Sequence, residues 1–455
     1  MAETVPPTRQ PAAPHRAPVV KVLLIAVLVV VLLIPLFLVH ETIDERHDRH
    51  RAAVAEIGFS WGRPQSLVGP ILVVPYSEER READGRTTVQ RHRLMIFPER
   101  VAFEGGISPE IRRRGLFEAV VYRSTLSTHA RFQMPDPAAL AGPRARLEPE
   151  DAFIAVGLTD PRSIDPGFVV RIDGQATPVA PESAMRAGNL AWLRAPSPSP
   201  RAGSTTAVDF DLRFAGSERL LLAPVGKETR ATMTGAWGSP SFTGAFLPTE
   251  RSITEDRFDA AWAISWFGRG FGESWATGEA GDPGAAFEQS LFGVTLLQAV
   301  GPYRQIERAA KHGILFLVLT FSAYLMFELL GGVRIGIVSY GLVGLSLCLF
   351  YVLLLALAEP FGFAPAYGLA AAAVVLQAGC YTAAVARSLV RGLTMAGLLA
   401  GLYGLLFVIL GLESYALLAG ALALFAALSA VMYVTRRIDW SRPVAPQTPG
   451  IPASA

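Results

Sequence analysis

An apolar run near the N-terminus predicts a first membrane-spanning helix. Residues 22–39 are apolar, with Pro35 as their one interruption. A bilayer core requires roughly 20 residues of helix, so a segment over residues 19–40 is long enough to cross it. A cleaved signal peptide is the alternative, but the run is long and ends in a charged segment without a small-residue cleavage site. We therefore expect an uncleaved membrane anchor.

Residues 41–311 contain no apolar run long enough to span, and their pattern is typical of strands. The first part, residues 41–56, is charged and free of Gly and Pro, which predicts that the first helix continues beyond the membrane. Further on, apolar residues alternate with polar or small ones, most clearly at Val208, Phe210, Leu212 and Phe214, at Val120, Tyr122, Leu126 and Phe132, and at Trp262, Ile264 and Trp266. Alternation with period two places one set on a buried face and the other in water. We expect a large antiparallel, β-rich domain here.

Clusters of Pro, Gly and Ser interrupt this domain around residues 135–148 and 196–204. Such clusters are typical of loops. Either one is a candidate boundary between two subdomains.

The C-terminal part of the chain is apolar again and predicts a five-helix transmembrane bundle over residues 312–435. Its apolar runs fall at about 313–332, 336–358, 363–386, 393–411 and 415–434. Together with the first helix they give six spans and an α+β membrane protein. Residues 1–18 and 436–455 flank the spans as cytoplasmic tails, and the composition of the first predicts disorder.

The charges in the short links predict the orientation. Arg334, Arg387 and Arg391 lie in alternate links, whereas the remaining links carry Glu359 and Glu413 and no Lys or Arg. Basic short loops face the cytoplasm. Both termini are therefore expected on the cytoplasmic side of the membrane, with residues 41–311 on its outer side.

Composition excludes several classes of function. The hydrophobic share of 51% fits a chain that is part membrane and part aqueous domain, and the net charge of +2 does not indicate nucleic-acid binding. Both cysteines, Cys348 and Cys380, lie in apolar runs, so no disulfide can stabilise the outer domain. The common catalytic and nucleotide-binding motifs are absent from the sequence. We expect no catalytic residues, no cofactor and no resident metal.

Glu328 is the first candidate functional residue, because an ionisable group at membrane depth is costly and therefore often functional. It lies about one turn from the cytoplasmic end of its run, with Tyr324 one turn back on the same face. That position also allows its carboxylate to reach headgroups or a neighbouring Arg, so a purely structural role is the alternative.

A second candidate cluster is expected at the outer surface. Arg308, Lys311 and His312 precede the second span, and the predicted topology brings Glu359 and Glu413 to the same level. Exposed ion pairs there would contribute under about 1 kcal/mol each, which fits simple docking of the outer domain. The alternative interpretation is that these residues form a polar entrance for a substrate.

Four residues just after the first span, His40, Asp44, His47 and His50, have helical spacings of three and four. This spacing suits a transition-metal site. Because helical spacing alone does not make four ligands converge on one ion, a solvated, salt-bridged helix extension is the preferred interpretation.

An ordered set of motifs over residues 35–440 resembles the CreD family of bacterial inner-membrane proteins. In the outer domain the set includes Leu67-Val68-Gly69-Pro70, Pro240-Ser241-Phe242 and Phe246-Leu247-Pro248. In the membrane half it includes Arg308-Ala309-Ala310-Lys311, Phe327-Glu328, Leu342-Val343-Gly344-Leu345 and Ile438-Asp439-Trp440. The resemblance implies a role in cell-envelope integrity and in the response to envelope or β-lactam stress. It implies no established catalytic activity, cofactor or ligand.

Three functions follow as hypotheses. The first is a non-enzymatic envelope protein acting through its outer domain, with the bilayer and envelope components or other membrane proteins as partners. The second is a transporter or lipid-handling protein that uses the bundle and depends on Glu328. The third is a membrane enzyme with outer-face chemistry at His312, Glu359 and Glu413. The oligomeric state is left open.

Overall fold

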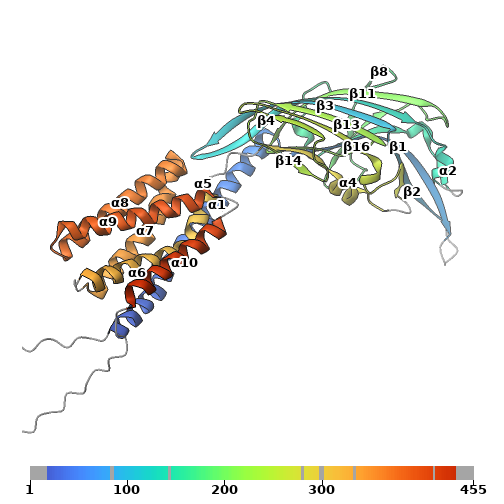
Figure 1. Cartoon of the computed structure of the whole chain (residues 1–455). Helices are drawn as coiled ribbons and strands as arrows, with labels where there is room; N and C mark the ends of the chain where they lie inside the picture. The colour runs from blue at the N-terminus through green and yellow to red at the C-terminus, as the bar shows by residue number, and fades with distance from the viewer. Residues whose placement is uncertain are drawn as a thin grey trace, which may run out of the picture. The chain divides into compact units, whose positions relative to one another are not determined.

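The computed structural model describes residues 18–81, 87–141, 145–277, 281–296, 302–331, 335–412 and 416–436. Most of both expected tails, and Glu413, lie outside these residues. The chain forms two compact units (Figure 1). The helical unit comprises Met1–Asp48 and Val300–Ala455, and the two-sheet unit comprises Arg49–Ala299.

The helical unit contains the predicted apolar runs as helices: α1 (Pro18–Trp61), α6 (Gly313–Gly331), α7 (Ile337–Phe361), α8 (Phe363–Val385), α9 (Leu389–Gly411) and α10 (Ala416–Thr435). It also contains α5 (Pro302–Lys311), a segment that the sequence pattern assigned to the outer domain. The expected extension of the first helix is confirmed, because α1 continues without a break through the charged segment to Trp61. The boundary between the two units falls within this helix.

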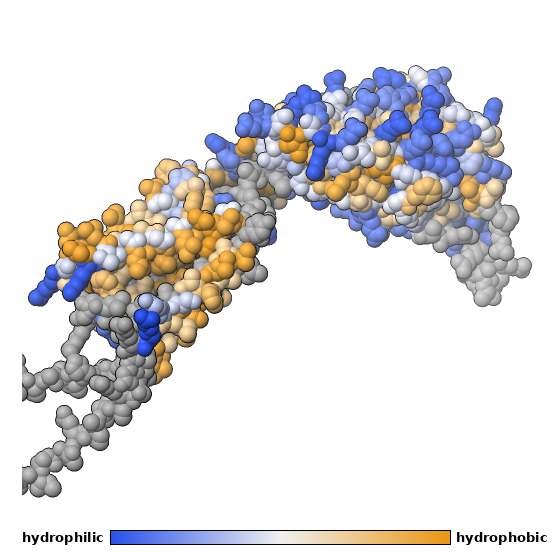
Figure 2. All heavy atoms as spheres, viewed as in Figure 1, coloured by the Kyte–Doolittle hydropathy of each residue, from blue (hydrophilic) through white to orange (hydrophobic). Residues whose placement is uncertain are grey.

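Several of these helices have the length and composition of membrane spans. Within the described part of the chain, α1, α7, α8 and α9 are each long and apolar enough, and α5 with α6, bent by 49° between them, adds a fifth if the pair is one span. Large apolar side chains face outward, such as Leu376 and Leu393, which are 65% and 63% exposed. Figure 2 shows the orange, hydrophobic surface that these helices present. Such a surface suits lipid rather than water.

The two-sheet unit consists of two mixed sheets with short helices. The first sheet contains β1 (Gln65–Arg81), β2 (Thr87–Ile96), β5 (Ala145–Leu147), β6 (Phe153–Leu158), β9 (Ala180–Glu182), β10 (Ala191–Pro196), β12 (Arg219–Leu222), β14 (Pro240–Gly244), β17 (Ser274–Ala276) and β18 (Phe292–Leu296). The second contains β3 (Arg100–Arg114), β4 (Phe117–Gln133), β7 (Val169–Ile172), β8 (Gln175–Pro178), β11 (Thr205–Ser217), β13 (Glu228–Gly235), β15 (Glu250–Ile253) and β16 (Phe258–Ser265). Helices α2 (Pro137–Ala141) and α4 (Gly284–Ser290) complete the unit.

The predicted alternation is confirmed in the second sheet. Phe210 and Leu212 of β11 are 1% and 0% exposed, and Leu212 lies opposite the equally buried Leu126 of β4. The intervening Asp211 is exposed. One hydrophobic core contains inward-facing residues of both sheets, so the sheets pack face to face.

Two features differ from the sequence expectation of antiparallel strands. β1 pairs with β12, and β3 with β13, in parallel, because these strands are far apart in the chain and long connections allow that direction. Trp266 does not continue the alternation of Trp262 and Ile264, because β16 ends at Ser265 and a 3₁₀ turn follows.

The core includes a tight contact between neighbouring strands. Tyr122 of β4 is fully buried and its hydroxyl donates a hydrogen bond of 2.8 Å to the Arg219 carbonyl. Burial raises the pKa of Tyr122, so the hydroxyl stays protonated as a donor. A Cβ at Gly216 would lie 2.4 Å from the Tyr122 hydroxyl oxygen, which explains why glycine occupies that position.

Candidate functional site

Glu328 lies near the end of α6, and two neighbouring helices hold its carboxylate. Lys21 of α1 forms an ion pair with Oε1, and the Tyr340 hydroxyl of α7 donates a hydrogen bond of 3.1 Å to Oε2. The Lys21 ammonium also donates to the Ile335 carbonyl at 2.7 Å and lies 5.5 Å from the centre of the Tyr340 ring. The partner of Glu328 is thus a lysine of the same chain.

This pair connects segments from opposite ends of the sequence in a setting where charge is costly. The side chains of Lys21 and Glu328 are 26% and 13% exposed. In a bilayer the environment of both side chains is less polar still, and an unpaired charge there is unfavourable. Removing either partner would leave the other uncompensated, so the loss of one charge is expected to weaken the contact between α1 and α6.

A second polar contact extends from the same face of α6. Tyr324 is 2% exposed, and its hydroxyl lies 2.9 Å from Thr382 Oγ1 of α8. Thr382 donates its own hydrogen to the Ala378 carbonyl at 2.7 Å, so the Tyr324 hydroxyl is the donor between the two. The rings of Tyr324 and Tyr340 are 5.9 Å apart. Lys21, Glu328, Tyr340, Tyr324 and Thr382 thus form a polar cluster to which α1, α6, α7 and α8 contribute.

Helices α7 and α8 make further polar contacts beside a small cavity. The Ser346 hydroxyl donates to Gln377 Oε1 at 2.9 Å, and the hydroxyls of Ser339 and Tyr381 are 3.1 Å apart. A cavity of about 190 Å³ lies beside these residues, lined otherwise by apolar side chains such as Leu345 and Leu349. It has the chemistry to hold part of an acyl chain.

The ion pairs of two residues of the predicted outer-surface cluster lead to residues outside that cluster. Glu359 of α7, whose side chain is 11% exposed, lies 3.5 Å from Arg46 of α1. Lys311 pairs with Glu307 one turn back on α5 at 2.7 Å. His312 is half-buried at the turn between α5 and α6, and no hydrogen bond or ion pair joins its side chain to another described residue. Glu413 lies outside the described residues.

The ion pairs on α1 mark two levels along the helical unit. Lys21 and Arg46 are 25 residues apart on one helix, or about 37 Å at 1.5 Å per residue. Their partners, Glu328 and Glu359, lie near the C-terminal ends of α6 and α7. A hydrocarbon core is about 30 Å thick, so the two pairs are spaced to bracket it.

The histidines that follow the first span do not form a metal centre in the described part of the chain, where no three His, Cys, Asp or Glu side chains are grouped to hold an ion. His50 packs against Phe117 of β4 instead, with ring centres 5.7 Å apart.

Arg269 is a buried cation in the two-sheet unit that sequence patterns did not indicate. Its guanidinium lies against the rings of Phe97 and Phe271, at 5.2 and 4.5 Å from their ring centres, and the two rings also contact each other. Its guanidinium donates to the carbonyls of Phe271, at 3.0 Å, Val225 and Gly272. Burial lowers the pKa of Arg269 to about 10, and Glu273 partly offsets this. The Arg269 guanidinium thus joins the loops that contain Val225 and Gly272, which is a structural role.

Lys21 and Tyr340 were missed as site residues by sequence reasoning. Lys21 is a single basic residue at the start of an apolar run, and Tyr340 is one aromatic residue within another. Their convergence on Glu328 depends on how three helices pack, and no local pattern reports that.

Comparisons with known proteins confirm the family resemblance. The sequence profile of the family described as "Inner membrane protein CreD" matches residues 17–441. The inner membrane protein CreD of Escherichia coli strain K12 is 33% identical over 417 residues, which cover 90% of this chain and 91% of that protein.

Among solved structures, an M1 zinc metallopeptidase from Deinococcus radiodurans matches 37% of this chain and 38% of its own, at 11% identity and a TM-score of 0.19. A two-domain M1 metallopeptidase mutant bound to L-arginine gives the same TM-score and identity and matches 39% of its own chain. The match thus spans well under half the length of these enzymes, and a score this low supports no argument about fold or activity.

Proposed function

Because the chain belongs to the CreD family of inner membrane proteins, we propose that it is a six-span protein whose two-sheet unit faces the periplasm and supports cell-envelope integrity without catalysis. The helices α1 and α6 to α10 are the spans. Arg387 and Arg391, beside the link between α8 and α9, favour cytoplasmic termini by the positive-inside rule. The role in envelope or β-lactam stress rests on the family resemblance.

The ion pair between Lys21 and Glu328 carries the proposal that the helical unit is an anchor. The carboxylate accepts from Lys21 and Tyr340, so its charge is already compensated by the chain itself. A carboxylate that carries a substrate or proton must exchange partners, whereas one that braces two helices keeps them. The two-sheet unit is then the part that contacts envelope components or other membrane proteins.

The test is complementation of a strain that lacks its own copy, with envelope permeability to a dye as the readout. The double variant Lys21→Gln/Glu328→Gln removes both charges and so leaves no unpaired ion. If the helical unit is an anchor, this variant retains envelope function when it is expressed at the level of the parent protein. A chain in which a short Gly/Ser linker replaces residues 65–296 should lose function while its helices still insert.

Transport or lipid handling is the second candidate, and the 190 Å³ cavity beside Ser346 and Gln377 favours it. A transporter that depends on the carboxylate would lose function in Glu328→Gln and in the double variant alike. Loss of complementation by well-expressed, folded double variant would therefore replace the anchor proposal with this one.

A further inference from the structure

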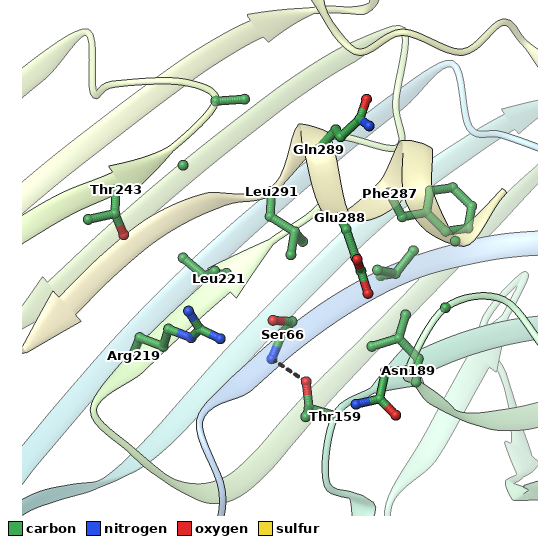
Figure 3. Close-up of a pocket in the computed structure, with 16 residues that line it drawn as sticks. Ser66, Thr159, Asn189, Arg219, Leu221, Thr243, Phe287, Glu288, Gln289 and Leu291 are labelled. Atoms are coloured by element: carbon green, nitrogen blue, oxygen red, sulfur yellow. Dashed lines mark hydrogen bonds between the residues drawn. The ribbon is translucent and has the colours of Figure 1, made fainter. Parts of the chain in front are cut away.

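A groove with a volume of about 710 Å³ lies on the first sheet of the two-sheet unit, beside α4. Leu220 and Leu222 of β12 are fully buried in the core, whereas Arg219 and Leu221, on the opposite face of that strand, line the groove. β1, β14 and the segment after β6 contribute the remaining floor (Figure 3). The volume lies within the range of about 300–1,000 Å³ that is typical of small-molecule sites.

Two opposite charges face each other across this groove. Arg219 comes from β12 and Glu288 from α4, and both side chains are exposed. Figure 3 shows the guanidinium and the carboxylate reaching toward Ser66 from different sides. Neither charged group has an ion pair or a side-chain hydrogen bond among the described residues. Both are therefore available to a ligand.

Neutral donors and acceptors surround the two charges. Asn189 and Gln289 supply amides, and Thr243 supplies a hydroxyl. Thr159 Oγ1 accepts a hydrogen bond of 3.0 Å from the Ser66 backbone N–H, which orients the Thr159 hydroxyl at the floor (Figure 3). The lining also includes apolar side chains, among them the half-buried Leu190 and Leu291. The groove therefore offers both charge recognition and an apolar contact.

Backbone packing holds the rim of the groove in place. A Cβ on Gly284, at the start of α4, would lie 2.0 Å from the Gly188 nitrogen. A Cβ on Gly244, which has a φ of +105°, would lie 2.1 Å from the Leu291 carbonyl oxygen. These contacts hold the loop at Gly188 against the start of α4 and the end of β14 against Leu291, which fixes this part of the rim.

We propose that this groove binds a zwitterionic ligand of the amino-acid or short-peptide class. The guanidinium of Arg219 pairs with the ligand carboxylate, for which its planar fork of donors is suited. The carboxylate of Glu288 accepts from the ligand ammonium, and the amides of Asn189 and Gln289 bind neighbouring polar groups. A ligand with one charge would leave either Arg219 or Glu288 without a partner. The inference goes beyond the proposed function, because it assigns a ligand to the unit.

The test is calorimetric titration of the purified full-length protein in lipid nanodiscs with alanine and with tri-alanine. These two probes distinguish a free amino acid from a short peptide as the ligand. Two capped probes, N-acetyl-tri-alanine and tri-alanine amide, each lack one charge. We expect at least one uncapped probe to bind, and capping either end to weaken binding about tenfold or more, as loss of a charge-assisted hydrogen bond does.

Variants assign each charge to its partner. Arg219→Gln should weaken the binding of tri-alanine or alanine about tenfold but leave the binding of the amide probe unchanged. Glu288→Gln should weaken the binding of tri-alanine or alanine by a similar factor but leave the binding of the N-acetyl probe unchanged. Arg251→Gln and Glu255→Gln, which alter exposed charges outside the groove, are the matched controls. Failure of both uncapped probes to bind at about 10 mM overturns the proposal. Equal binding of capped and uncapped probes, or unchanged binding in both groove variants, overturns it as well.

These outcomes are separate from complementation. The groove can bind its ligand in a protein that fails the envelope test, and the reverse also holds.

Discussion

Lys21 and Glu328 are 307 positions apart in the sequence, yet they form an ion pair that joins α1 to α6. The contact places the start of α1 beside the end of α6. This is the arrangement expected of consecutive spans that cross a membrane in opposite directions.

The stability of this pair gives the first prediction. Glu328→Gln and Lys21→Met each leave a partly buried charge uncompensated, so each should lower the free energy of unfolding of the detergent-solubilised protein by about 1–3 kcal/mol. The exchange Lys21→Glu/Glu328→Lys restores opposite charges and should recover at least half of the loss. Thermal or denaturant unfolding measures this, and single variants as stable as the parent would contradict it.

Arg269 is expected to be important for the two-sheet unit. Arg269→Met keeps apolar contacts with Phe97 and Phe271 but leaves several carbonyls without their donor, which should cost about 2–4 kcal/mol of unfolding free energy. Unfolding followed by tryptophan fluorescence reports it. Arg251→Met, at an exposed position, is the control and should change stability by less than about 0.5 kcal/mol. Equal effects of the two substitutions would rule out the structural role.

Asp160 predicts a pH dependence of stability. Arg162 Nε and Nη2 each donate to its carboxylate at 2.8 Å, and this holds the pKa of Asp160 below its ordinary value of 3.8. Because the folded-state pKa is lowered, the stabilisation is fully present above the unfolded value and is lost as the pH falls through the folded value.

The matched variant is Asp160→Asn, which should be less stable than the parent by about 1–2 kcal/mol at pH 7. The difference between the two should shrink as the pH falls below 3.8. Denaturant titrations at pH 7, 5 and 3 measure it. A difference that stays constant across this range would mean that the carboxylate charge is not responsible.

The proposed orientation can be tested with single cysteines. Replacing Cys348 and Cys380 by Ala gives a background without thiols, to which Ser252→Cys in the two-sheet unit or Ser388→Cys between α8 and α9 is added. A membrane-impermeant thiol reagent should label the first in cells whose outer membrane alone has been opened, and the second only after lysis. The reverse pattern would invert the topology.

Local patterns were sufficient for much of the architecture. The apolar runs became helices, because burial of a continuous apolar surface and satisfaction of the backbone favour a helix in lipid. The alternation at Val208, Phe210, Leu212 and Phe214 became a half-buried strand, because successive side chains of a strand point to opposite faces. Trp266 departs from its pattern, since a chain turn after Ser265 outweighs a weak alternation with small partners.

The candidate sites depended on contacts that no local pattern contains. Glu328 was recognisable from the sequence, because a lone carboxylate in an apolar run is unusual, but its partners Lys21 and Tyr340 come from two other helices. Arg219 and Glu288 are ordinary charged residues in the sequence, and they line one groove only because the fold brings β12 and α4 to its borders. The sequence by itself determined which segments are apolar helices and which are strands, since those choices follow from periodicity and length. The tertiary structure alone decided which charges meet, because that depends on the packing of elements far apart in the chain.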